Sequence, residues 1–347
     1  MRGDTITEQR RDTNAAGQAG SSNLSLDVSI IIVSWNTRDM VRDCLQSVYE
    51  QTRGVSFEVI LVDNASSDDT AAMVRTEFPQ VLLTANPDNR GFAAGNNQGF
   101  ERARGRYILM LNPDTVVLDN AIAKTIRYAD EHAEAGVVGC RVLWPNREWQ
   151  STCFRFHSLS QIALGSVAFF RMHRFFQWSI LHPDRYMNLD FTAEQDVDVV
   201  AGCFFLIPRQ VLTKVGRLDE SFFMYGEEAE FCHRVHRAGW RVRYFPGAQI
   251  VHIYGGSSNQ VIHEMSLNKR VAVLLFLDRT RGFLPAWVAN LFMLFGVLLR
   301  MPLWLAHSLH RRDPQQRNGL NGKWRIFKAH MTGVVKPIWR RGVCATK

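Results

Sequence analysis

The sequence predicts an α/β fold in which a mostly parallel central sheet is flanked by helices. Short apolar runs at 28–34, 59–63, 81–83 and 107–111 are rich in Val, Ile and Leu, a composition typical of strands that are buried on both faces. Segments with helical spacing or with capping residues separate these runs. Strands that alternate with helices at this spacing predict a parallel sheet with right-handed crossovers.

Each helical segment has its own local signal. Apolar residues recur over 40–48 at the spacing of one helix face, and Thr37 or Asp39 is placed to cap that helix. The stretch 66–70 is rich in Ser, Asp and Thr, which predicts that a second helix begins directly after it. The stretch 89–97 opens a third helix before the fourth strand.

Two acidic residues, Asp63 and Asp114, are predicted to close the second and the fourth strand. Ligands of parallel α/β sheets bind beyond the carboxyl ends of the strands. Carboxylates at that edge could hold Mg²⁺ or Mn²⁺ carried by a diphosphate, because hard oxygen ligands suit these cations. Either residue could instead cap the next turn or helix. A third acidic cluster further along the chain, at Glu227 and Glu228, favours a chemical role.

The glycine pattern argues against two common nucleotide-binding classes. No G-x-G-x-x-G follows the first strand and the chain has no G-x-x-x-x-G-K-[ST], so a dinucleotide oxidoreductase and a P-loop NTPase have little support. Gly91, Gly95 and Gly99 are spaced by four residues, which allows two interpretations. They could permit close helix packing, or a helix N-terminus with free N–H groups, beside Arg90, could approach an anionic phosphate.

Seven short motifs follow one another over roughly two thirds of the chain. They are VSWN at 33–36, VDNASSD at 62–68, NRGFAAGNN at 89–97, LNPD at 111–114, VVAGCF at 199–204, FFMYGEE at 222–228 and HIYGGS at 252–257. Through them the chain resembles the inverting glycosyltransferases of family 2, which have the GT-A fold, and in particular their rhamnosyltransferase-like branch. The resemblance implies a GT-A nucleotide-diphospho-sugar transferase domain over 27–265.

The resemblance implies a nucleotide-binding role for residues near the first strands. Asp63 would hydrogen-bond the nucleotide base, and Asn36 and its neighbours would line the same pocket. The residues implied to bind the nucleotide are Ser34, Asn36, Asp63, Arg90, Asn96 and Asn112.

The resemblance also implies a divalent cation, Mg²⁺ or Mn²⁺. Asp114 matches the last residue of the D-x-D metal motif, and His252 matches a downstream histidine that completes the metal site in some relatives. Asn112 stands where the motif has its first Asp, which removes one anionic ligand. His252 could instead be a buried strand-end histidine beside a Gly-Gly turn.

Glu227 and Glu228 fall where relatives carry Glu-Asp, whose second residue is the catalytic base. Because Glu228 is one methylene longer than Asp, either the acceptor lies slightly further away or the base role passes to Glu227. Inverting transfer needs one carboxylate within hydrogen-bond reach of the acceptor hydroxyl, on the face opposite the leaving group. It needs no covalent intermediate.

Composition limits what the rest of the chain can be. Residues 1–26 form a polar tail without an apolar run, which predicts disorder and no secretory signal. Six cysteines without paired spacing predict reduced intracellular thiols. The length suits one catalytic domain, at 27–265, and a helical appendage at 266–347.

The appendage is apolar first and then basic. Residues 282–299 are 18 uncharged residues, the lower limit for a spanning helix. Residues 300–347 carry eleven Lys and Arg against one acid, Asp313, a balance of +10, whereas the whole chain is +8. A single span would export this basic segment against the positive-inside rule. The pattern therefore predicts an in-plane or re-entrant helix and a basic segment that meets anionic lipids. A buried helix pair with a solvated tail is the alternative, and the net acidic remainder of the chain argues against nucleic acid.

Together these features predict a metal-dependent inverting glycosyltransferase at the cytoplasmic face of the cell membrane. By resemblance its donor would be a nucleotide sugar, dTDP-L-rhamnose, with UDP-sugars as the alternative. The acceptor would be a polyprenyl-linked saccharide or a growing surface polysaccharide. Two other classes stay open, namely a GT-A-fold nucleotidyltransferase, although the expected Gly-rich Lys/Arg signature is missing, and a catalytically silent membrane scaffold, against which Asp114 and Glu228 argue.

Overall fold

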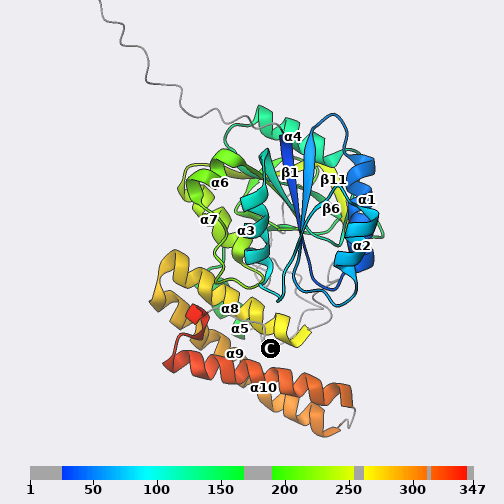
Figure 1. Ribbon diagram of the computed structural model, residues 1–347. Helices are drawn as coiled ribbons and strands as arrows, with labels where there is room; N and C mark the ends of the chain where they lie inside the picture. The colour runs from blue at the N-terminus through cyan, green and yellow to red at the C-terminus, as the bar shows by residue number, and fades with distance from the viewer. Residues whose placement is uncertain (1–25, 168–189, 254–261, 311–313, 342–347) are drawn as a thin grey trace, which may run out of the picture.

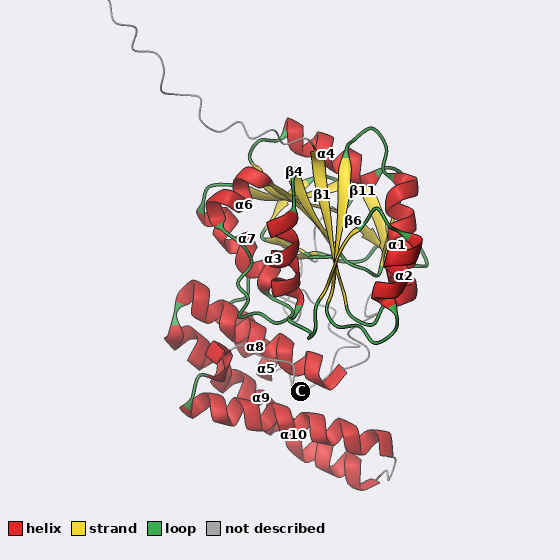
Figure 2. Ribbon diagram, in the orientation of Figure 1, coloured by secondary structure: helices red, strands yellow, loops and turns green. Residues whose placement is uncertain are grey.

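The computed structural model describes residues 26–167, 190–253, 262–310 and 314–341. An α/β domain lies above a layer of long helices (Figure 1). Its central sheet has helices on both sides (Figure 2). Of the predicted polar tail, only Leu26 belongs to the described residues, where it begins the first strand.

The first half of the sheet is parallel, as the sequence predicts. β1 is central, with β2 on one side and β4 on the other, and β3 lies beyond β2. These strands are β1 (Leu26–Ser34), β2 (Phe57–Asp63), β3 (Leu82–Ala85) and β4 (Gly105–Leu111). The helices between them are α1 (Arg38–Gln51), α2 (Thr70–Glu77) and α3 (Phe92–Arg102). Each strand end lies within two residues of its predicted position.

The second half of the sheet contains both parallel and antiparallel strands. The predicted parallel arrangement therefore holds for the first half of the sheet only. β10 is antiparallel to both of its neighbours, β4 and β6, and β6 is parallel to β11. β5 and β8 are antiparallel to β11. These strands are β5 (Thr115–Val117), β6 (Ala135–Leu143), β8 (Gln195–Val197), β10 (Phe204–Pro208) and β11 (Arg241–His252). A separate small sheet pairs β7 (Cys153–Phe154) with β9 (Val199–Val200).

The strands of the first half are buried on both faces. Successive residues of β1 enter different cores, because side chains alternate along a strand. Ile31 packs in a core that includes residues of α3 and α7, whereas Ile30 and Ile32 pack in a core that includes residues of α1 and α4. The helices of the second half are α4 (Ala121–Glu131), α5 (Leu159–Val167), α6 (Arg209–Val215) and α7 (Glu227–Arg237). The continuous apolar runs of the sequence are explained by this two-sided burial.

The prediction that Thr37 or Asp39 caps α1 is wrong. Thr37 occupies the N-cap position, but its hydroxyl lies 3.0 Å from the Ser34 hydroxyl and makes no capping hydrogen bond. Asp39 lies inside the first turn. Instead the carboxylate of Asp68, in the loop after β2, accepts the backbone N–H of Arg38 at 2.8 Å. A tertiary contact therefore takes the place of the local cap.

Three long helices form the C-terminal layer. They are α8 (Ile262–Arg281), α9 (Phe283–His310) and α10 (Pro314–Val335), and the short helix η4 (Ile338–Arg341) follows. One hydrophobic core contains sheet residues, residues 274–277 of α8, Ala289 of α9 and Trp339 of η4. The boundary expected between 265 and 266 falls inside the first turn of α8, and the core is continuous across it.

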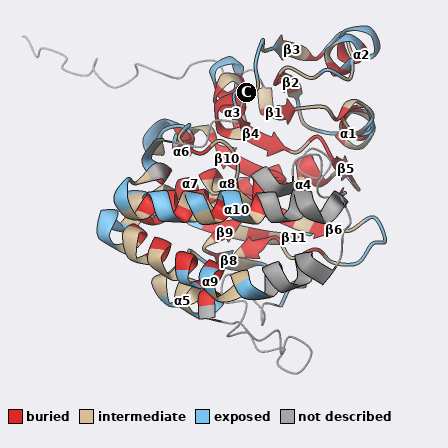
Figure 3. Cartoon of the chain, turned by 90° about the horizontal axis from the view of Figure 1, so that it is seen from below, coloured by how far each residue is buried: buried red, intermediate tan, exposed pale blue. Residues whose placement is uncertain are grey.

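The apolar segment of the appendage lies within α9, which packs against α5, α8 and α10. Asn290 of α9 and His330 of α10 form a buried pair, in which the Asn290 amide donates to the His330 carbonyl at 3.0 Å. Their side chains are 2.7 Å apart. Within the described residues, one segment, Phe283–Pro302, is long and apolar enough to cross a membrane, and 39% of it is buried. Figure 3 shows exposed stretches along α9 and α10.

Candidate active site

Asp63 and Asp114 lie at or just beyond the carboxyl ends of the two strands that flank β1. Asp63 is the last residue of β2, as predicted. β4 ends at Leu111, so Asp114 lies three residues beyond it, in the turn before β5, and not at the strand end itself. Pro113 explains the difference, since proline has no N–H to donate to a sheet. Both acidic residues are buried.

The ends of β1 and β2 form the predicted nucleotide edge. Ser34 and Asp63 are aligned in the register of the two strands. Asn36 has a φ of 52°, and its side-chain oxygen accepts the backbone N–H of Ser67 at 2.7 Å. Asp63 Oδ2 accepts the backbone N–H of Ser66 at 3.2 Å, but its buried Oδ1 has no hydrogen-bond partner among the described residues. This oxygen can accept a hydrogen bond from a ligand.

Asn64, which the sequence reasoning did not single out, fixes the loop that follows β3. Its amide nitrogen donates to the Gly91 carbonyl at 3.0 Å, and its side-chain oxygen accepts from Asn86 at 2.8 Å. Asn86 also donates to Gln98 of α3 at 2.8 Å. The partners are far from Asn64 in sequence, so the only available signal was its place beside Asp63 in the 62–68 motif.

At the start of α3, the first N–H groups are already used within the protein: the Gly91 N–H donates to Asn89 Oδ1 at 3.0 Å. The N–H of the first residue of the helix, Phe92, donates to the Phe223 carbonyl at 2.7 Å. Arg90 is exposed. Asn96 is buried inside the helix and donates to the Phe92 carbonyl at 2.9 Å. The structure thus ties the N-terminus of α3 to the loop before α7.

The glycines at 95 and 99 serve close packing, the first of the two interpretations left open by their spacing. A Cβ at Gly95 would lie 2.7 Å from Val33 Cγ1, and one at Gly99 would lie 2.4 Å from Ile31 Cγ2. Only glycine therefore lets α3 approach β1 this closely.

The structure brings together the residues predicted as the metal site. β11 pairs with β5 so that His252 is opposite Thr115, and the N–H of Ile253 donates to the Asp114 carbonyl at 2.9 Å. His252 Nε2 consequently lies 3.2 Å from Asp114 Oδ1 and 3.5 Å from Asn112 Nδ2. Sequence reasoning missed a fourth member, Gln150, whose Oε1 lies 2.8 Å from His252 Nδ1.

The donor set of this cluster fits a divalent cation. The buried Oδ1 of Asn112 has no partner among the described residues, so one amide oxygen is available beside the Asp114 carboxylate and the His252 ring. Adjacent ligands at about 2.1 Å from an octahedral Mg²⁺ lie about 3 Å apart, close to the observed Asp114–His252 separation. In the part of the chain that the structure describes, no group of three or more His, Cys, Asp and Glu side chains could hold a metal.

Glu227 and Glu228 are the first residues of α7, and a strained turn presents them. Tyr225 and Gly226 have φ values of 72° and 87°. A Cβ at Gly226 would lie 3.1 Å from Phe222 and 3.2 Å from Ala272 of α8, so the position suits glycine for both conformation and space. The Gly226 N–H donates to Glu228 Oε2 at 3.0 Å.

Burial raises the pKa of both glutamates. The pKa of Glu227 lies well above its ordinary value, first because the side chain is buried and second because the Glu228 carboxylate is close. Burial also raises the pKa of Glu228, but hydrogen bonds from backbone N–H groups oppose the shift. Glu228 is less buried and its carboxylate accepts the Gly226 N–H, which favours its ionised form, so Glu228 is the glutamate placed to act as a base.

Cys203 connects the acidic turn with the predicted metal cluster. Its backbone carbonyl accepts the Asn112 N–H at 3.1 Å. Burial raises the pKa of its thiol to about 12, and the carboxylates of Asp114 and Glu228 both add to this shift. Both carboxylates therefore act electrostatically on the same buried thiol.

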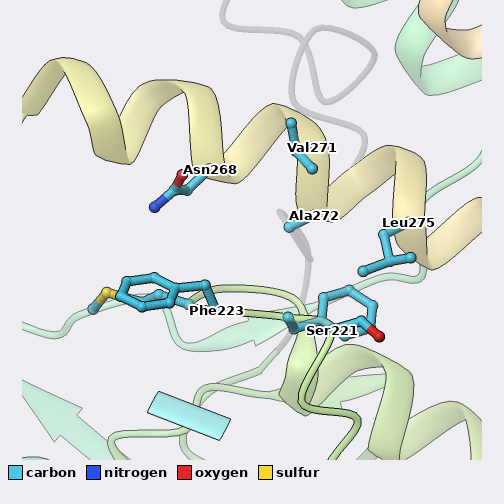
Figure 4. Close-up of a pocket in the computed structure, with 8 residues that line it drawn as sticks. Ser221, Phe223, Asn268, Val271, Ala272 and Leu275 are labelled. Carbon is cyan, nitrogen blue, oxygen red and sulfur yellow. The ribbon is translucent and has the colours of Figure 1, made fainter. Parts of the chain in front are cut away.

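Helix α8 covers the loop that precedes the acidic turn. Figure 4 shows Asn268, Val271, Ala272 and Leu275 of α8 facing this loop, which carries Phe223. The cavity between them is about 10 Å³, enough for one water molecule. The loop is thus packed between α8 and the start of α3.

Comparisons with known proteins show what the chain is similar to. The sequence model of the family described as glycosyl transferase family 2 matches residues 29–216. A glycosyltransferase of Bacillus subtilis, YfnE, is 34% identical over 122 residues, which cover 34% of this chain and 30% of that protein. The N-acetylglucosaminyl-diphospho-decaprenol L-rhamnosyltransferase of Mycobacterium tuberculosis is 24% identical over 281 residues, which cover 76% of this chain and 89% of that protein.

Other matches are partial, and a solved structure adds the fold. The chain spans 30%, 17% and 30% of the length of three relatives that it matches. A mannosyltransferase from Pyrobaculum calidifontis, solved in complex with GDP-Man and Mn²⁺, is 14% identical with a TM-score of 0.53, covering 90% of this chain and 88% of that one. This likeness shows that the fold is that of the GT-A glycosyltransferases. Since the family model matches more than half of the chain, the protein belongs to glycosyl transferase family 2.

Proposed function

We propose that this protein is an inverting glycosyltransferase that moves L-rhamnose from dTDP-L-rhamnose to a polyprenyl-linked saccharide or a growing surface polysaccharide. The observation that carries the transferase reaction is the buried pair of His252 Nε2 and Asp114 Oδ1, 3.2 Å apart, in a chain that the family model matches over more than half of its length. The choice of rhamnose is supported by similarity to the mycobacterial rhamnosyltransferase, which extends over most of both chains.

In the proposed donor site, Asp63 accepts a hydrogen bond from the nucleotide base. Its unpartnered Oδ1 supports this role, because a buried acceptor is stabilised when a ligand supplies the missing donor. Ser34 and Asn36, which lie beside it at the ends of β1, would line the same pocket. Arg90, which is exposed, and Asn112 would lie along the diphosphate. Asn96 would act only by holding the first turn of α3 in place.

In the proposed metal site, Asp114, His252 and the side-chain oxygen of Asn112 would hold Mg²⁺ or Mn²⁺. A divalent cation there would supply positive charge that stabilises the departing nucleoside diphosphate. The amide at 112 contributes no negative charge, so a metal-bound diphosphate would provide part of the anionic ligand set.

In the proposed transfer step, Glu228 accepts the proton of the acceptor hydroxyl. The acceptor oxygen forms a bond to the anomeric carbon while the bond from that carbon to the diphosphate oxygen breaks on the opposite face. The bonding electrons leave with the nucleoside diphosphate, and the proton stays on Glu228. The raised pKa of Glu227 supports Glu228 as the base, because a carboxyl that keeps its proton cannot accept another.

We further propose that α9 and α10 hold the protein at the cytoplasmic face of the membrane. Large apolar side chains are exposed on both helices, among them Phe295 and Leu298 on α9 and Trp324 on α10. Arg325 and Lys328 on α10 are exposed as well. Apolar and basic groups on one helical layer are the two signals that peripheral attachment needs.

The proposed donor is tested with a panel of nucleotide sugars. Purified full-length protein is incubated with dTDP-L-rhamnose, UDP-sugars or GDP-mannose and a polyprenyl-diphosphate saccharide, with Mg²⁺ or Mn²⁺, and transfer of label to lipid is measured. We expect transfer from dTDP-L-rhamnose and its loss in Asp63→Asn, with the exposed Asp69→Asn as a matched control. Transfer from another donor only would contradict the rhamnose assignment. Release of pyrophosphate from a nucleoside triphosphate would favour a nucleotidyltransferase.

A further inference from the structure

Gln150 is a buried side chain to which the proposed reaction gives no role. It lies in the segment that follows β6, directly after Trp149, which forms an isolated antiparallel bridge with Leu143. Its backbone N–H donates to the Val142 carbonyl at 2.9 Å, so its position is fixed by the sheet. Its side-chain oxygen lies 2.8 Å from His252 Nδ1.

Two amide contacts indicate where the neutral His252 ring carries its proton. An amide oxygen can only accept a hydrogen bond, so His252 Nδ1 facing Gln150 Oε1 must carry the proton. The lone pair of the neutral ring is then on Nε2. Asn112 is consistent with this, because its Nδ2, which can only donate, lies 3.5 Å from Nε2.

The same tautomer creates an unfavourable contact that a cation would relieve. Nε2 lies 3.2 Å from Asp114 Oδ1 in a buried site; a doubly protonated ring would form an ion pair there, whereas in the neutral ring the Nε2 lone pair faces the carboxylate oxygen. Two acceptors at this distance repel each other, whereas a positive ion between them is attracted to both. The Nε2 lone pair is also the form of histidine that coordinates metals.

The amide nitrogen of Gln150 makes no hydrogen bond to the described residues, which suggests that the amide oxygen has a specific role. Gln150 Nε2 is buried and has no hydrogen-bond partner among the described residues. A buried donor without a partner is unfavourable, so an apolar residue would suit this position better if only packing mattered. Leucine at this position would lack the oxygen that accepts a hydrogen bond from His252.

We propose that Gln150 is a positioning residue that holds His252 in the Nδ1-protonated tautomer and aims Nε2 at the cation beside Asp114. The proposal rests on the proposed metal role of His252 and Asp114, and it adds the residue that fixes the orientation and the proton of this ligand. Partners of this kind change metal affinity without touching the metal.

The first test reads the ring directly in metal-free protein. Nitrogen-15 NMR of ring-labelled histidine, at a pH where neutral imidazole prevails, reports which nitrogen carries the proton. His252 is assigned by the signal lost in His252→Ala. We expect the proton on Nδ1 in the native protein and in Gln150→Glu, which keeps an acceptor oxygen, and a mixture of tautomers in Gln150→Leu. A proton on Nε2 in the native protein, or the same single tautomer in Gln150→Leu, would overturn the proposal.

The second test measures Mn²⁺ binding without any reaction, from the electron paramagnetic resonance signal of the free ion. Gln150→Leu should bind Mn²⁺ about 10–100-fold more weakly than the native protein. Gln150→Glu and the matched control Gln249→Leu, which removes an amide from the same strand as His252, should not be weakened. Unchanged affinity in Gln150→Leu would contradict the positioning role. A native protein that binds no Mn²⁺ would instead contradict the proposed metal site, and the tautomer measurement would still decide the role of Gln150.

Discussion

At the scale of single residues, Asp114 and His252 are the pair on which the proposed metal role depends. Asp114→Asn keeps the size of the side chain but removes the charge that attracts a cation. We expect it to abolish transfer and to leave the fold intact, and chelation should have the same effect on the native protein. His252→Ala should be milder, since a divalent ion also takes ligands from phosphate and water. Label transfer and circular dichroism measure the two effects.

The control for this prediction is Asp119→Asn, five residues further along the chain. Asp119 is exposed and has a φ of 44°, a conformation that asparagine also adopts readily. The Asp119→Asn variant should keep native activity. Full activity of the native protein in excess chelator would reduce Asp114 to a structural residue of the β4–β5 turn.

The acidic turn gives a second prediction at this scale. Glu228→Gln keeps the size and hydrogen bonding of the side chain but cannot accept a proton, so turnover should fall about 10²–10⁴-fold while donor binding is preserved. Glu227→Gln should be much less impaired, because Glu227 is proposed to be neutral already. Single-turnover kinetics with both variants separates the roles, and the opposite ranking would make Glu227 the base.

The raised pKa values predict how activity depends on pH. A protonated Glu228 cannot act as base, and its pKa is raised above the ordinary 4.5. Activity should therefore be lost as the pH falls through a value above 4.5, and this acid limb should be absent from the residual activity of Glu228→Gln. The pH profile of kcat/KM measures it. An acid limb at or below the ordinary pKa would show that burial does not perturb the base.

The free energy of unfolding should fall as the pH rises, whereas activity should rise with pH. The unfolded chain releases the Glu227 proton near pH 4.5, whereas the folded protein retains it, so rising pH favours unfolding. Native protein should lose about 1.4 kcal/mol of unfolding free energy per pH unit relative to Glu227→Gln, from pH 4.5 up to the folded pKa. Urea unfolding of both proteins at about pH 5 and about pH 8 tests this. A constant difference between them would mean that Glu227 ionises normally in the folded state.

At the scale of secondary structure elements, the N-terminus of α3 and the loop before α7 hold each other in place. Gly91 has a φ of 85° and a ψ of 173°, a region that is almost exclusive to glycine. A Cβ at this position would also lie 2.4 Å from the Phe223 carbonyl oxygen. This contact joins the Asp63 side of the site to the Glu228 side.

Gly91→Ala should therefore cost more than backbone strain alone. Strain of a non-glycine residue at such a position is of order 1–3 kcal/mol, and the clash with a backbone atom adds to it. Gly54→Ala is the matched control, because Gly54 also has a positive φ, 74°, but has no atom within 4 Å of the added Cβ. Urea unfolding should show a larger loss for Gly91→Ala, together with reduced turnover. Equal losses would mean that the loop moves freely away.

At the scale of the whole molecule, the C-terminal helices are part of the protein's core, and α8 covers the loop next to the candidate active site. Phe276 of α8 stacks on Phe156, and Arg279 of the same helix donates to Asp219 at 2.7 Å. Arg340 of η4 forms an ion pair with Asp278. Truncation after α8 would expose this core, so a substitution on the surface is the better test of membrane attachment.

Charge reversal on α10 provides that test. Arg325 and Lys328 are exposed, and each basic residue near an anionic surface contributes about 1 kcal/mol of binding. The double variant Arg325→Glu, Lys328→Glu should bind anionic vesicles at least about 30-fold more weakly. Donor binding should not change. The control is the equivalent double variant at the exposed residues Arg53 and Arg75 on the catalytic domain. Vesicle cosedimentation measures binding, and equal weakening by both pairs would contradict a membrane-facing α10.

Local patterns in the sequence were sufficient for the elements of the first half of the sheet. Apolar runs and helical spacing are properties of neighbouring residues. The runs at 28–34 and 59–63 are typical of strands that are buried on both faces, as the structure shows them to be. The antiparallel insertion of β10 between β4 and β6 could not be predicted in this way. Strand order is decided by which apolar faces meet in space, and no local pattern records it.

The sequence by itself determined the α/β class, the parallel half of the sheet and the identity of most candidate site residues, because motif chemistry lies within a few consecutive residues. The tertiary structure alone decided which of them meet. His252 reaches Asp114 only through the pairing of β11 with β5, and Gln150 reaches His252 across 102 positions of sequence. It also decided that Phe223 occupies the N-terminus of α3 and that Asp68 caps α1. Hydrogen bonds and ion pairs depend on distances of about 3 Å, and only the packed fold sets those distances between residues that are remote in the chain.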